Sequence, residues 1–140
     1  MADPRAFISF DFDHDEDHKN LFVGQSKNSR VPFTIQDWSA KEAMPQGEWE
    51  RLVEEKIRRC NMVIVLVGQY MKTATGVAKE IRMAQNNNVP FFGVYVGNAG
   101  PGSNLPEGLI SWRTIAWTWA GIADKVEQMM QEGKNKKGWF

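Results

Sequence analysis

Apolar and polar positions change their spacing several times along the chain, and these changes predict alternating strands and helices. Residues 6–12, AFISFDF, alternate and are rich in strand-forming residues, which predicts a first strand. Residues 15–27, DEDHKNLFVGQSK, carry acids at the start and apolar residues inside, which predicts a short helix. Residues 32–38, PFTIQDW, predict a second strand opened by a proline, and residues 39–47 predict a loop.

The second half of the chain continues the alternation. From Glu48 the apolar positions recur at helical spacing, at Trp49, Leu52, Val53, Ile57 and Cys60. Residues 61–69, NMVIVLVGQ, are an unbroken apolar run typical of a central parallel strand buried on both faces. A helix is predicted from about Thr75, a fourth strand at 89–97, an irregular loop at 98–110 and a fifth strand at 113–119. A final helix follows, marked by Ile122, Val126, Met129 and Met130.

This order of elements predicts an α/β fold. Alternating strands and helices form a parallel sheet with helices on both faces, because crossover connections are right-handed. Five strands suggest a flavodoxin-like three-layer sandwich with a five-stranded parallel sheet of order 2-1-3-4-5. In such sheets, ligands bind at the carboxyl ends of the strands, near the switch point between strands 1 and 3. We therefore expect sites just after Phe10, after Gly68 and on the loop after Trp38.

Composition narrows the class of protein. About 42% of the residues are hydrophobic and 24% are charged, as in a globular domain, and 140 residues suffice for one core. We predict a single domain over residues 1–132 and a flexible C-terminal tail over 133–140, where the basic stretch GKNKK lies. Seventeen basic residues balance seventeen acidic ones, so charge does not argue for nucleic acid or membrane binding.

Cysteine content and the N-terminal segment bear on the compartment. Cys60 is the only cysteine, which excludes an internal disulfide and a cysteine-based metal site. The first residues form no apolar signal region, and no apolar run approaches the length of a membrane span. These features predict a cytoplasmic protein.

Five carboxylates lie within seven positions after the first predicted strand. Asp15, Glu16 and Asp17 fall where the first helix should begin, and acids at that end interact favourably with the helix dipole. Asp11, and less strongly Asp13, fall at the carboxyl end of the strand, where the fold places its crevice. For Asp11 the functional and structural interpretations are equally supported. The two nearby histidines lack clustered partners, and no metal site is predicted.

Several families that share this architecture are excluded by their motifs. A response-regulator receiver needs an aspartate at the end of strand 3, where this chain has VLVGQY, and a lysine after strand 5. The sequence contains neither GxxxxGK[ST] nor a helix-opening GxGxxG, the motifs of common nucleotide sites. A flavodoxin would carry a Ser/Thr-rich phosphate loop after strand 1, where the acids of this chain would repel a phosphate.

Two further segments border the predicted crevice. Glu80 falls about one turn into the helix after strand 3, one residue before the inward-facing Ile81, so it can face back into the crevice. Trp38, Lys41 and Glu42 lie on the loop after strand 2. An aromatic side chain there can stack on a flat ligand or, equally well, cover the edge of the core.

The residues at these positions resemble a known family. RAFISFDFDHDED resembles the first strand and acidic turn of TIR domains, and NMVIVLVGQYMKTATGVAKEIRMA resembles their third strand and the following helix with its glutamate. GQS at 24–26, DW at 37–38 and KE at 41–42 resemble the bacterial and archaeal TIR-like group that includes the Thoeris anti-phage TIR proteins. The resemblance extends from about Phe7 to Met130.

This resemblance implies an activity and its residues. Enzymatic TIR domains cleave the nicotinamide–ribose bond of NAD and release nicotinamide with ADP-ribose or a cyclised product. The catalytic glutamate of the family corresponds to Glu80, which would stabilise an oxocarbenium-like ribose. NAD is then the substrate, and no cofactor or metal is implied. The implied substrate-binding residues are Ser9, Phe10, Asp11, Trp38, Lys41 and Thr75.

One position departs from the family. Many members carry a tryptophan four residues before the glutamate, where this chain has Gly76. Either Trp38 or Trp117 supplies the stacking face, or NAD is not the substrate. The alternatives are a non-catalytic module that binds a protein or nucleotide, and a nucleotide-processing enzyme that uses Asp11, Asp13 and a metal. The implied partners are other copies of the domain and a separate effector protein, with neither nucleic acid nor membrane.

Overall fold

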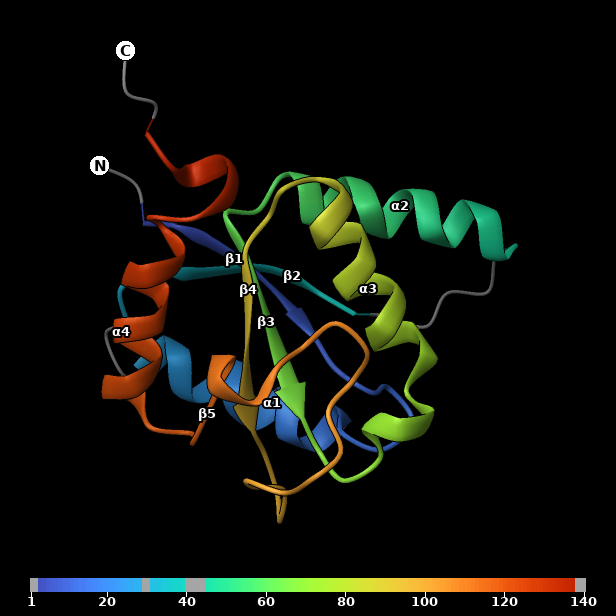
Figure 1. Ribbon diagram of the computed structural model, residues 1–140, viewed down its shortest axis with the longest axis vertical. Helices are drawn as coiled ribbons and strands as arrows, with labels where there is room; N and C mark the ends of the chain where they lie inside the picture. The colour runs from blue at the N-terminus through green and yellow to red at the C-terminus, as the bar shows by residue number, and fades with distance from the viewer. Residues whose placement is uncertain (1–2, 29–30, 40–44, 138–140) are drawn as a thin grey trace.

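Five parallel strands in the order β2-β1-β3-β4-β5 form the sheet of the computed structural model, which describes residues 3–28, 31–39 and 45–137 (Figure 1). The predicted order and the flavodoxin-like α/β class are confirmed. Every pairing is parallel, as expected for strands joined by helical crossovers. The strands are β1 (Arg5–Ser9), β2 (Thr34–Trp38), β3 (Met62–Val67), β4 (Phe91–Tyr95) and β5 (Thr114–Ile115).

Helices cover both faces of the sheet, which makes three layers (Figure 1). α2 (Gln46–Arg58) and α3 (Thr75–Asn86) bury Val53, Ile57, Val77 and Ile81 on one face. α1 (Glu16–Asn28) and α4 (Trp119–Met129) bury the apolar cluster of the other face, which includes Phe22, Ile122, Val126 and Met129. None of the helices within the described ranges is long and apolar enough to span a bilayer.

The central strand β3 explains the unbroken apolar run of the sequence. All six of its residues are buried. Val63, Val65 and Val67 belong to the core under α2 and α3, while Met62, Ile64 and Leu66 belong to the core under α1 and α4. A strand with helices on both sides has no solvent face, so its sequence does not alternate.

Two strands, β1 and β5, are shorter than their sequence pattern predicts. β1 ends at Ser9 instead of residue 12, because the chain turns there and Asp15 N donates to Asp11 O at 2.8 Å. β5 has two residues instead of the predicted 113–119. Arg113 lies in a 3₁₀ turn, and Thr118 caps α4 by accepting a hydrogen bond from Gly121 N. Local caps therefore compete with strand pairing at the sheet edge.

The segment after α4 contacts the rest of the fold at its start. Residues Gly133–Asn135 form a 3₁₀ turn. The Asn135 amide nitrogen donates to Asn61 O at 2.7 Å and to Met129 O at 3.1 Å, and Lys134 Nζ donates to Arg58 O at 2.5 Å. These contacts lie within the segment predicted as a tail, whose last residues, 138–140, fall outside the described ranges. The domain boundary at 132 remains a prediction.

Candidate active site

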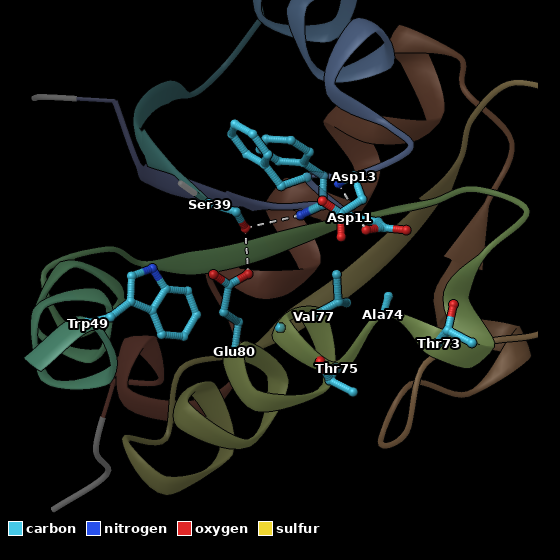
Figure 2. Close-up of a pocket in the computed structure, with 12 residues that line it drawn as sticks. Asp11, Asp13, Ser39, Trp49, Thr73, Ala74, Thr75, Val77 and Glu80 are labelled. Carbon is cyan, nitrogen blue, oxygen red and sulfur yellow. Dashed lines mark hydrogen bonds between the residues drawn. The ribbon is translucent and has the colours of Figure 1, made fainter. Parts of the chain in front are cut away.

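A pocket of about 180 Å³ opens at the carboxyl end of the sheet, between the segments that follow β1, β2 and β3 (Figure 2). This is the edge at which doubly wound sheets bind ligands. Most of the lining side chains come from the turn after β1 and from the start of α3. The lining residues are Phe10, Asp11, Phe12, Asp13, Ser39, Trp49, Thr73, Ala74, Thr75, Gly76, Val77 and Glu80.

Glu80 is the most deeply buried ionisable group of the pocket, with 1% of its surface exposed. Its Oε1 atom accepts hydrogen bonds from Ser9 Oγ at 2.7 Å and Ser39 Oγ at 2.5 Å (Figure 2 draws the second). Burial raises the pKa of Glu80 to about 7, and the two serine hydrogen bonds partly oppose that rise. Oε2 has no hydrogen-bond partner within the described part of the chain. The carboxyl group therefore changes charge near neutral pH, and its second oxygen is buried without a hydrogen-bond partner in the described part of the chain.

The two serines are held by the ends of adjacent strands. Ser9 is the last residue of β1. Ser39 follows β2 directly, and its backbone nitrogen donates to Ile8 O at 2.9 Å, which extends the parallel pairing by one residue. Phe10 N also donates to Ser39 Oγ at 3.2 Å. Strand pairing thus sets the position of both hydroxyl groups, and α3 supplies the Glu80 carboxyl group that they contact.

Asp11 is fixed at the opposite side of the pocket from α3 (Figure 2). It is 8% exposed, its Oδ1 accepts from Asp13 N at 3.2 Å, and its Oδ2 lies 2.6 Å from His14 Nδ1. The His14 ring stacks on Tyr70, with centroids 3.9 Å apart. Asp11 and Glu80 therefore place two carboxyl groups on the wall of one pocket.

Asp15 differs from the interpretation drawn from the sequence. Glu16 and Asp17 lie in the first turn of α1, as predicted, but Asp15 precedes the helix and is 2% exposed. Its Oδ1 lies 3.1 Å from His18 Nδ1, and burial raises its pKa. It packs so closely on Gly68 that a Cβ atom there would lie 2.3 Å from its Oδ2. Asp15 joins the start of α1 to the end of β3 and is absent from the pocket lining.

The predicted site residues fall into three groups. Four of them line the pocket: Phe10, Asp11, Thr75 and Glu80. Ser9 is not among the lining residues, but its hydroxyl donates a hydrogen bond to Glu80 Oε1. Trp38 is not among the lining residues: it is 39% exposed, and its ring lies 4.7 Å from Lys19 Nζ. Lys41 falls outside the described residues. Their roles in substrate binding remain predictions.

Trp117, the other proposed stacking residue, lies on the far side of the sheet. It packs with Phe22, at 5.5 Å between centroids, in the core under α1 and α4. Ser39 and Trp49 also line the pocket, and neither was predicted from the sequence as a site residue. Ser39 had a signal, since it begins the loop expected to border the crevice. Trp49 had no signal of a site role in the sequence, because its helical spacing predicted a core position. In the structure it does pack in part against the core.

No metal centre is evident in the described ranges, which contain no group of three or more His, Cys, Asp or Glu side chains that could hold an ion. Asp11 and Asp13 are both in the pocket lining, but within the described part of the chain they belong to no group of three residues with the geometry of a metal site.

Comparison with known proteins places the site in a family context. A family profile described as "Thoeris protein ThsB, TIR-like domain" matches residues 7–100, a range that includes Ser9, Ser39 and Glu80. The crystal structure of a prokaryotic SEFIR domain aligns with a TM-score of 0.56 at 18% sequence identity, and the alignment covers 98% of each chain. A 3-dehydroquinate dehydratase-like protein from Bifidobacterium longum aligns with a TM-score of 0.43 at 14% identity, over 92% of this chain and 95% of that one. No curated protein matches the sequence significantly.

Proposed function

Because the chain belongs to the family of the Thoeris ThsB TIR-like domain, we propose that it cleaves the nicotinamide–ribose bond of NAD, in bacterial anti-phage defence or signalling. One observation carries the proposal. Glu80 is buried in the pocket with a pKa of about 7 and with Oε2 unpartnered in the described chain. A carboxylate of this kind can contact a ribose hydroxyl and the positive charge that develops beside it.

The chemistry needs little acid catalysis. The bond from ribose C1′ to the nicotinamide nitrogen breaks, and its electron pair leaves with the ring as neutral nicotinamide. The ribose becomes oxocarbenium-like, and ionised Glu80 stabilises this charge in a site of low polarity. Water then attacks C1′ and loses a proton to give ADP-ribose, or a nucleophile within the ADP-ribose attacks and gives a cyclic product. Ser9 and Ser39 orient the carboxylate through Oε1, and the buried Oε2 contacts the substrate when the pocket opens further.

The test is direct. Purified protein is incubated with NAD, alone and in extracts from phage-infected cells, and nicotinamide release is followed by chromatography. Glu80→Gln, which keeps the size and the acceptor oxygen for the two serines, is expected to lower the rate at least 100-fold. Ser26→Ala serves as a control, since this α1 hydroxyl donates to Val23 O. Equal nicotinamide release by wild type and Glu80→Gln under activating conditions would overturn the mechanism.

A second candidate is a non-catalytic TIR-like module that binds a protein or nucleotide. The near-complete burial of Glu80 favours it, because a ligand reaches Oε2 only if the pocket opens further. Under this hypothesis the segment from Ser39 to Gly47, much of it outside the described residues, matters more for binding than Glu80 does. Under both hypotheses, the proposed partners are other copies of the domain and a separate effector protein.

Analytical ultracentrifugation with and without NAD tests whether the domain self-associates.

A further inference from the structure

Lys19, in α1, is a largely buried cation that the proposed cleavage reaction does not use. Only 9% of its surface is exposed. Its Nζ atom lies 4.7 Å from the centroid of the Trp38 ring and 5.6 Å from that of the Phe10 ring, so both rings are within reach of a cation–π contact. Nζ is not among the fully buried unpaired polar atoms of the described residues. The ammonium therefore reaches the surface while its aliphatic stem is covered.

The positive charge of Lys19 has no acidic partner in the part of the chain that the structure describes. Nζ forms no ion pair with a carboxylate there. Two buried acids that precede it, Asp11 and Asp15, are paired instead with His14 and His18, at 2.6 and 3.1 Å. Aromatic rings hold a cation without neutralising it, so this ammonium keeps its attraction for an anion.

The two rings place Lys19 beside the pocket. Phe10 is one of the lining residues, and Trp38 directly precedes Ser39, whose hydroxyl contacts Glu80. α1 and α3 cover opposite faces of the sheet, so a ligand that contacts both Glu80 and Lys19 crosses the carboxyl ends of β1 and β2. Doubly wound sheets bind their ligands across this edge.

The pocket is large enough for only part of a dinucleotide. Its volume is about 180 Å³, whereas sites that enclose a drug-sized ligand have about 300–1,000 Å³. In NAD, a single methylene group and an oxygen join the nicotinamide ribose to the diphosphate. With that ribose beside Glu80, the diphosphate lies outside the pocket but close to it, where a cation at the rim can meet it.

We propose that Lys19 binds the diphosphate of the dinucleotide substrate, with its ammonium held at the rim of the pocket by the rings of Phe10 and Trp38. This inference rests on the proposed NAD-cleaving function and adds the residue that binds the part of the substrate outside the pocket. An ammonium donates charge-assisted hydrogen bonds to phosphate oxygens. Because the stem of Lys19 is already covered, binding immobilises little additional side chain.

Binding to the full chain carrying Glu80→Gln tests the inference without turnover. Calorimetry compares NAD with nicotinamide riboside, which has the same cationic ring and ribose but no phosphate. Lys19→Met, which keeps an unbranched apolar stem, is expected to weaken NAD binding roughly 5- to 50-fold and to change nicotinamide riboside binding little. Lys19→Arg should retain most of the affinity, because it retains the charge. Lys27→Met is the matched control, since Lys27 is exposed in the last turn of the same helix.

Trp38 has a positioning role in this proposal, because it acts through Lys19. Trp38→Leu removes one of the two rings and is expected to weaken NAD binding less than Lys19→Met does. The double variant should bind NAD as well as Lys19→Met alone, because the ring has no role once the ammonium is gone. Additive losses would overturn the positioning role of Trp38.

ADP-ribose separates the two proposals, because it contains the diphosphate but lacks the bond that the proposed reaction breaks. Its binding to the wild type is expected to depend on Lys19 as NAD binding does. If NAD is cleaved but Lys19→Met binds NAD and ADP-ribose as the wild type does, the inference is overturned and the proposed function stands. If NAD is not cleaved under activating conditions while ADP-ribose binds in a Lys19-dependent manner, the proposed function fails and Lys19 remains a diphosphate-binding residue.

Discussion

Ser39 Oγ lies 2.5 Å from Glu80 Oε1, although the two residues are 41 positions apart in the chain. One follows the edge strand β2 and the other lies in the second turn of α3, so the hydrogen bond joins two segments that are separated in the sequence by α2 and β3. The same carboxyl oxygen accepts from Ser9 at the end of β1. Three segments thus meet at one carboxyl group, and its ionisation depends on all of them.

The stability of the protein is expected to fall with rising pH because of Glu80. Its pKa rises from an ordinary 4.5 to about 7 on folding. Between these values the folded state binds more protons at this group than the unfolded state does, so the free energy of unfolding decreases as pH increases. The expected loss is on the order of 3 kcal/mol across this window.

Urea unfolding of wild type and Glu80→Gln at pH 4.5 to 8 measures the effect. The difference between the two curves isolates Glu80 from Asp15, whose pKa is also raised. Glu80→Gln is expected to be the more stable of the two at pH 8. Parallel curves for the two proteins would contradict an ionisation of Glu80 in this range.

Removing the hydroxyl of Ser39 is expected to raise the pKa of Glu80 further. The hydrogen bond from Ser39 favours the ionised carboxyl group, and a hydrogen bond to a charged group contributes enough to move a pKa by about one unit or more. The carboxyl ¹³C resonance of Glu80 in Ser39→Ala, followed against pH, reports the midpoint. Ser26→Ala should leave the midpoint of that resonance unchanged. An unchanged midpoint in Ser39→Ala would show that this hydrogen bond does not control the charge.

Two glycines are expected to respond oppositely to alanine. Gly76 lies in α3 with open space around its Cβ position, so Gly76→Ala should stabilise the protein by about 0.5–1 kcal/mol. Gly68→Ala should destabilise it by about 1–3 kcal/mol, because the new Cβ atom would displace the buried Asp15 carboxyl group. Gly24→Ala, also in a helix with open space, is the control for Gly76→Ala. Thermal unfolding of the three variants decides the signs, and stabilisation by Gly68→Ala would contradict the close approach of Asp15.

The contacts of Asn135 test where the domain ends. Its side chain donates to Asn61 O and Met129 O and accepts from the Asn61 amide at 3.0 Å. Asn135→Ala is expected to lower the free energy of unfolding by about 1–3 kcal/mol, because it leaves part-buried polar groups unpaired. Lys137→Ala is the control, since its side chain is exposed. Equal stability of Asn135→Ala and wild type would support a domain that ends at residue 132.

Much of the fold follows from local patterns. The unbroken apolar run of β3, the helical spacing over residues 49–60 and the alternation between strands and helices were sufficient to predict the sheet order 2-1-3-4-5. Burial imposes a period on each element, and the crossover rule then leaves few topologies. Doubly wound sheets bind ligands at the carboxyl ends of their strands, and this property located the candidate site. The strands β1 and β5 were predicted too long, because caps and turns ended them.

Only the tertiary structure shows which residues line the pocket. Trp38 lies in β2, Trp49 in α2 and Trp117 between β5 and α4. Nothing in their local sequence shows that, of these three, Trp49 alone lines the pocket. Which of them does so depends on how α2 packs against α3 and on where β2 ends. The sequence determined the period of each element and hence the architecture. Contacts between distant residues, such as Ser39 and Glu80, depend on packing and register, and only the tertiary structure could supply them.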